Sequence, residues 1–127
     1  MNETRNLDPV AMERLQRLGG DAFVGKMIEL FLSYAGEKVV AARKAQVAGN
    51  LGGVQEAVHP IKSSAGNIGA CRVQELAQQI EQLAKQGQGD ALPALIGELE
   101  KAFDVVKREL TAKRQPPASN ATGAAGT

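Results

Sequence analysis

Apolar residues recur at intervals of three and four along most of the chain, and glycines separate the periodic segments. In one segment the spacings are four, three, four and three before Gly69, through Val54, Val58, Ile61, Ala65 and Ile68. This period matches one face of an α-helix, whereas no segment has the strict alternation of a half-buried strand. The pattern therefore predicts an all-α protein.

The same periodicity predicts five helices, at about residues 8–18, 21–48, 51–68, 70–86 and 90–113. Four of them are long enough to span a small domain, so we expect an antiparallel four-helix bundle with a short additional N-terminal helix. The length of 127 residues fits one domain, which we place at 1–115. Small and polar residues with two prolines fill 116–127, which predicts a disordered tail.

Composition excludes several classes of partner. Fifteen Lys and Arg against fourteen Asp and Glu leave a net charge of +1, and the chain has three Phe, one Tyr and no Trp. A protein that holds nucleic acid needs a basic surface or stacking aromatics, so we expect no nucleic-acid partner. No run of eighteen apolar residues is present, so we expect no membrane segment. The single cysteine, Cys71, excludes an internal disulfide and favours a cytoplasmic location.

His59 is the only histidine, and it lies off the apolar stripe of its helix. Lys62, Ser63 and Gly66 share its strip at i+3, i+4 and i+7, so we expect an exposed imidazole with a cation within reach. Alone, such a histidine is usually a surface residue without a chemical role. A neutral imidazole is nonetheless a nucleophile toward phosphorus at neutral pH, provided that an acceptor fixes the proton on its other nitrogen.

Glu81 is the candidate for that acceptor. If the helices on either side of Gly69 fold back on each other, the residue opposite His59 lies near position 79. The polar residues there are Gln78, Gln79, Glu81 and Gln82, of which Glu81 is the only carboxylate. We therefore expect Glu81 to accept a hydrogen bond from the imidazole.

The stretch 58–70, VHPIKSSAGNIGA, resembles the histidine-containing phosphotransfer (HPt) domains of bacterial phosphorelays. Their pattern is His, two residues, Lys, then Gly or Ser, a small residue, and Gly-Ala some ten residues on. This pattern is matched by His59, Lys62, Ser63, Ser64, Gly69 and Ala70, and Glu81 falls where the family carries a Glu or Gln that binds the histidine.

The resemblance implies a phosphoryl carrier rather than an enzyme with its own kinase activity. His59 would be phosphorylated, with Lys62 as its charge partner, Ser63 as a small neighbour, Glu81 as the orienting acceptor and Gly69 as the end of the helix. Response-regulator receiver domains and a hybrid sensor kinase would be the partners. The receivers would supply Mg²⁺, so we expect no metal or other cofactor on this chain, and a monomer is our expectation.

Pro60 is an unusual residue inside a helix, because proline removes a backbone hydrogen bond and clashes with the carbonyl four residues earlier, that of Glu56. The helix either breaks at Pro60 or kinks beside His59. We expect a local kink that tilts the imidazole toward solvent.

The surface that binds the receiver is placed by folding the chain back about Gly49-Asn50. This brings residues near position 41 opposite His59, and predicts contacts from Val39, Val40 and Arg43. We expect Phe31 and Tyr34 in the core. The alternative function is a helical module that binds and blocks a receiver or sensor kinase without carrying phosphate.

Overall fold

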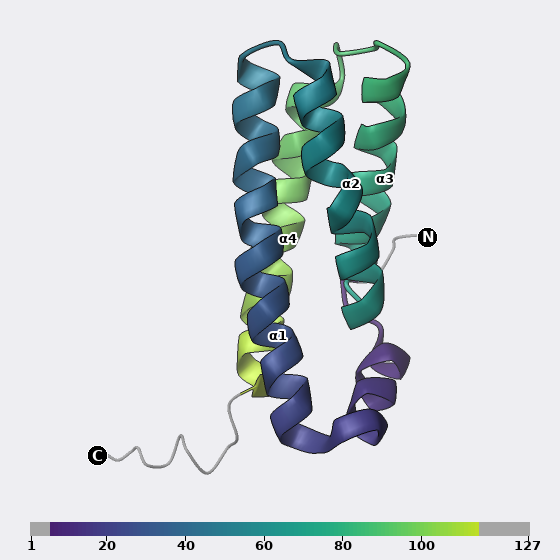
Figure 1. Ribbon diagram of the computed structural model, residues 1–127, viewed down its shortest axis with the longest axis vertical. Coiled ribbons are helices and arrows are strands. Elements are labelled where there is room, and N and C mark those ends of the chain that lie inside the picture. Colours follow the sequence, from purple (N-terminus) through teal and green to yellow (C-terminus); the bar gives the residue numbers. More distant parts are fainter. Residues whose placement is uncertain (1–5, 115–127) are drawn as a thin grey trace, which may run out of the picture.

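The structure, a computed structural model, describes residues 6–114. This part of the chain forms four α-helices, which are α1 (Pro9–Val47), α2 (Leu51–Ile68), α3 (Cys71–Lys85) and α4 (Leu92–Arg114). Helix α1 packs against α2 and α4, and α3 packs against the same two helices, which gives a closed bundle (Figure 1). The predicted all-α four-helix bundle is confirmed. The tail predicted at 116–127 lies outside the described residues.

The first two predicted helices, at 8–18 and 21–48, form the two arms of α1. Its backbone leaves the helical region at Gly20, where φ is +78° and ψ is −171°. Glycine adopts a positive φ at little cost because it has no Cβ. We call residues 7–19 the N-terminal segment, and Figure 1 shows it in purple, turned away from the long arm of α1 toward the end of α2. The Asp8 carboxylate caps the segment by accepting a hydrogen bond from the Val10 backbone N–H at 3.0 Å.

The core of the bundle is aliphatic. All five residues of the stripe recognised in the sequence between Val54 and Ile68 are at most 2% exposed. Leu76 and Ile80 of α3 and Ile96 and Leu99 of α4 are equally buried. Among the described residues, aromatic packing is confined to one pair, Phe31 of α1 and Phe103 of α4. Their ring centroids lie 5.9 Å apart.

Gly69 ends α2 with a left-handed backbone, at φ +82°. Its carbonyl accepts a hydrogen bond of 2.8 Å from the backbone N–H of Asp8, which attaches the N-terminal segment to the end of α2. A Cβ at position 69 would lie 2.7 Å from the Cβ of Ala11. Gly69 therefore serves both the turn into α3 and the close approach of the N-terminal segment.

Pro60 lies inside α2, and the helix continues through it from Leu51 to Ile68. Val58 and Ile61 on either side of it are fully buried, so packing holds both halves of the helix against the bundle. A break at Pro60, the alternative left open by the sequence, is therefore wrong. The kink that tilts the imidazole stays a prediction.

Candidate functional site

His59 and Glu81 meet across the interface between α2 and α3. The Nδ1 atom of His59 lies 2.6 Å from the Oε2 atom of Glu81. The two residues differ sharply in burial, since the histidine side chain is 67% exposed and the glutamate side chain only 5%. The Nδ1 edge of the imidazole ring is thus anchored to the protein, while most of the side chain is open to solvent.

Lys62 binds the other oxygen of the same carboxylate. Its Nζ atom lies 2.6 Å from Oε1 of Glu81, and its side chain is 32% exposed. The buried carboxylate is therefore paired through both oxygens, with an imidazole on one and an ammonium group on the other. We call these three residues, His59, Lys62 and Glu81, the imidazole cluster.

The pKa of Glu81 lies below the ordinary value for a glutamate. Burial on its own raises this pKa, because it penalises the charged form, but the hydrogen bonds from Lys62 and His59 and their charges together outweigh burial. The carboxylate is therefore ionised at neutral pH, and an ionised carboxylate only accepts hydrogen bonds. The short contact consequently places a proton on Nδ1 of His59, which leaves the lone pair of a neutral ring on Nε2.

Small residues allow the two helices to bring these groups together. Gly66 of α2 lies against Gln74 of α3, and a Cβ at position 66 would be 2.6 Å from the Gln74 amide nitrogen. On α3, Ala77 and Ala84 are buried one turn before and one turn after Glu81. Short side chains at these positions leave room for a carboxylate at the interface.

The other predicted residues of the site lie on α2. Ser63 is exposed one helical turn after His59, on the same side of the helix. Pro60 is partly buried beside the histidine. The structure thus assembles His59, Lys62 and Glu81 into one cluster, with Ser63 as an open neighbour.

The predicted partner surface on α1 is wrong for one of its three residues, Val39. Val39 is only 6% exposed and belongs to the core. Arg43 faces α4, where its Nε and Nη2 atoms lie 3.1 and 2.9 Å from the two carboxylate oxygens of Glu100. Val39 is therefore not available to a partner. The Arg43 side chain is 30% exposed, and its contact with a partner stays a prediction. Val40 is 54% exposed, and its role stays a prediction.

The core prediction for the two α1 aromatics holds for Phe31, at 5% exposure, and is wrong for Tyr34, at 44%. Leu30 is 52% exposed, although it belongs to the same apolar sequence pattern. The only sequence signal for these exposed apolar residues was a run of apolar residues wider than one helix face. That run did not show which of its residues are exposed to solvent.

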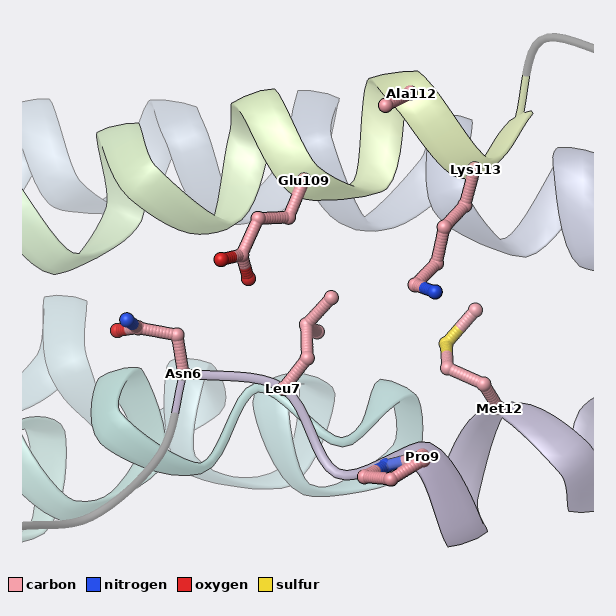
Figure 2. Close-up of a pocket in the computed structure, with 7 residues that line it drawn as sticks. All are labelled: Asn6, Leu7, Pro9, Met12, Glu109, Ala112 and Lys113. Carbon is pink, nitrogen blue, oxygen red and sulfur yellow. The ribbon is translucent and has the colours of Figure 1, made fainter.

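A hollow lies between the N-terminal segment and α4, and it includes no residue of the imidazole cluster. Leu7 and Met12 face Glu109 and Lys113 of α4 across it, as Figure 2 shows. Its lining includes no residue of α2 or α3.

Among residues 6–114, no group of three or more His, Cys, Asp or Glu side chains could hold a metal ion. No helix within that range is long and apolar enough to cross a membrane.

Comparison with known proteins agrees with this geometry. The family model of the Hpt domain matches residues 26–109, which include the whole imidazole cluster. The crystal structure of histidine-containing phosphotransfer protein B (HptB) from Pseudomonas aeruginosa PAO1 superposes with a TM-score of 0.82 at 24% identity, covering 87% of this chain and 95% of that one.

A second solved structure has the same fold. It is a rice protein described as a candidate histidine-containing phosphotransfer protein, with a TM-score of 0.76 at 20% identity, and the match covers 85% of this chain and 80% of that one. A search of curated protein sequences gives no match. The extent of the family match, together with a histidine, a lysine and a buried acceptor in the expected places, shows that the chain belongs to the Hpt domain family, the histidine phosphotransfer modules of phosphorelay signalling.

Proposed function

We propose that His59 receives a phosphoryl group from the aspartyl phosphate of one response-regulator receiver domain and passes it to the aspartate of another. The observation that carries the proposal is the 2.6 Å contact between Nδ1 of His59 and the buried carboxylate of Glu81. This contact leaves Nε2 as the nucleophile on a ring that is two-thirds exposed. A receiver can therefore bring its phosphoaspartate to the ring without any opening of the bundle.

The transfer needs no proton to move. The Nε2 lone pair attacks phosphorus, the bond from phosphorus to the aspartate oxygen breaks, and the aspartate leaves as a carboxylate. The ring then carries the phosphoryl group on Nε2 and retains its proton on Nδ1, so it gains a positive charge. The ionised Glu81 stabilises that charge at hydrogen-bond distance. In the second transfer a receiver carboxylate attacks phosphorus and the neutral imidazole leaves.

Lys62 provides the positive charge nearest to the phosphoryl group. Its ammonium group is bound to Glu81 in the unphosphorylated protein, and its side chain is about one-third exposed. A flexible lysine can turn from the carboxylate toward a phosphoryl group on the neighbouring ring, because both are anionic acceptors. The receiver would supply the Mg²⁺ that neutralises the phosphoryl group during transfer. The chain acts as a monomeric carrier without kinase activity of its own, downstream of a hybrid sensor kinase.

The test uses a panel of phosphorylated receiver domains and compares the wild-type protein with His59→Gln. The substituted side chain is exposed, so the fold should survive, which circular dichroism would verify. We expect acid-labile, alkali-stable label on the wild type and none on His59→Gln. If the wild type binds receivers but acquires no label, the function would instead be that of a module that only blocks its partner.

A further inference from the structure

Glu56 lies one helical turn before His59 on α2, and its side chain is exposed. Within residues 6–114 its carboxylate forms no ion pair, so no neighbouring cation of the described chain neutralises it. Glu81, by contrast, is buried and is paired through both of its oxygens with His59 and Lys62. The imidazole therefore has two acidic neighbours, of which only Glu81 is bound to it.

Helical spacing places Glu56 on the side of His59 that faces away from α3. Residues at i+3 and i−4 lie on one side of a helical residue, and residues at i−3 and i+4 lie on the other. Lys62, at i+3, contacts Glu81, so the i+3 side is the side of α3. Glu56 and Ser63, at i−3 and i+4, therefore flank His59 on the side away from α3, and both are exposed.

A phosphoryl group on Nε2 lies on this same side. Nδ1 of the ring is turned toward Glu81, so Nε2 lies at the edge of the ring farther from α3. A side chain on a helix also leans toward the N-terminus of the helix and covers the preceding turn. Lys62 leans in this way, since its ammonium group reaches back to the carboxylate that binds His59. The phosphoryl group is therefore closer to Glu56 than to Ser63.

Phosphorylation gives the His59 side chain a net negative charge. The phosphoryl group brings a charge of about −1.5 to −2 at pH 7, as on other phosphorylated side chains, whereas the ring gains one positive charge. The carboxylate of Glu56 repels the phosphorylated side chain but interacts little with the neutral ring. Glu56 therefore raises the free energy of the phosphorylated protein and leaves that of the unphosphorylated protein almost unchanged.

We infer that Glu56 sets the phosphoryl-transfer equilibrium of His59, because its charge repels the phosphoryl group and makes the carrier release it more readily. The inference rests on the proposed function. The effect belongs to the carrier alone, so it is the same for every receiver that exchanges phosphoryl groups with His59. Unit charges about 7 Å apart at an exposed site change an equilibrium constant by about three- to tenfold at low salt.

The transfer equilibrium with a panel of receivers tests the inference. Glu56→Gln removes the charge, and Glu109→Gln is the matched control. Glu109 is exposed on α4, which does not pack against α2 in the described part of the chain. We expect Glu56→Gln to raise the equilibrium constant for loading of His59 about three- to tenfold, by the same factor for each receiver. Glu109→Gln should match the wild type.

Two further comparisons separate charge from shape. Glu56→Asp keeps the carboxylate and should have an equilibrium constant close to that of the wild type. The difference between Glu56→Gln and the wild type should shrink as salt is raised to about 1 M, where the Debye length is about 3 Å.

A second measurement needs no receiver. The wild type and Glu56→Gln are phosphorylated with phosphoramidate, a small donor, and the phosphoryl group is titrated by phosphorus nuclear magnetic resonance. A nearby negative charge opposes the last ionisation of a phosphoryl group. We therefore expect the pKa of the phosphoryl group to be lower in Glu56→Gln than in the wild type.

An equilibrium constant that is unchanged in Glu56→Gln would overturn the inference. A change that differs from receiver to receiver would also overturn it, because Glu56 would then act through contact with the receiver. An unchanged pKa of the phosphoryl group would have the same consequence. Failure of receivers and phosphoramidate alike to label the wild type would instead remove the proposed function itself.

Discussion

Glu81 binds His59 and Lys62 at the same time, at 2.6 Å from Nδ1 of the ring and 2.6 Å from the ammonium nitrogen. Glu81 is the only charged residue that is fully buried among the described residues. Burying a carboxylate without a partner costs several kcal/mol, and pairing both oxygens offsets that cost. The same pairing fixes the proton of the imidazole, so one buried side chain serves both the α2–α3 interface and the nucleophile.

Loss of the lysine charge should slow phosphotransfer. Lys62→Met keeps the half-buried aliphatic stem but removes one charge-assisted hydrogen bond, worth about 1.5–3 kcal/mol. If that bond is made to the phosphoryl group in the transition state, transfer slows by about 10- to 100-fold. Single-turnover transfer from a phosphorylated receiver measures the rate. Lys62→Arg keeps the charge and should retain most of the activity, whereas a Lys62→Met protein as fast as the wild type would exclude a role for the charge.

Acid should destabilise the protein partly through Glu81. Its pKa is lowered in the folded state, so its ionisation stabilises the fold fully above the unfolded value, near 4.5, and this contribution disappears as the pH falls through the lower folded pKa. Glu100, whose pKa is lowered chiefly by its hydrogen bond to Arg43, adds to the same loss. Glu81→Gln removes only the first contribution.

Urea unfolding of the wild type and of Glu81→Gln at several pH values isolates that contribution. The free energy of unfolding of the wild type, relative to Glu81→Gln, should be larger at pH 7 than at pH 3. A difference that is constant across this range would mean that the pKa of Glu81 is the same in the folded and unfolded states.

Gly69→Ala should destabilise the protein more than Gly87→Ala. Both glycines have a positive φ, +82° and +73°, so an alanine at either position costs about 1–2 kcal/mol of backbone strain. Only at position 69 would the new Cβ also collide with Ala11, whereas nothing lies within 4 Å at position 87. Overpacking of this kind adds about 1–3 kcal/mol. Equal losses in thermal or urea unfolding would show that the N-terminal segment moves aside at no cost.

Pro60→Ala should stabilise the protein. The substitution restores an N–H that can donate to the carbonyl of Glu56, and a proline in a helix interior costs up to about 3 kcal/mol relative to alanine. We expect a gain of about 1–3 kcal/mol in urea unfolding, together with slower phosphotransfer if the kink tilts the imidazole toward its partner. A loss of stability would mean that the proline ring makes packing contacts worth more than the missing hydrogen bond.

The helices and the imidazole cluster could be predicted because both depend on local periodicity. The spacing from Val54 to Ile68 fixed which side of α2 is buried, and therefore that His59 is exposed. The turn at Gly69 then limited the residues opposite His59 to a few positions on α3, and only Glu81 among them carries a carboxylate. Its pairing with Lys62 as well as His59 was not predicted, since a lysine on the exposed strip has many rotamers.

The partner surface could not be predicted in the same way. Counting back from Gly49-Asn50 gave the level on α1 that faces His59, but not the rotation of α1 about its own axis. That rotation is set by long-range contacts such as Arg43 with Glu100, which are 57 residues apart in sequence. It buries Val39 and turns Arg43 toward α4, while Leu30 and Tyr34 are left open on the side of α2.

The most direct test of the central claim is to identify the ring nitrogen that carries the phosphoryl group. His59 is the only histidine in the chain, so ¹⁵N-labelled histidine gives a single pair of ring signals in the nuclear magnetic resonance spectrum. After transfer from a receiver, the account predicts phosphorus coupled to Nε2 and a proton retained on Nδ1. Phosphorus on Nδ1, or on no histidine nitrogen at all, would contradict it.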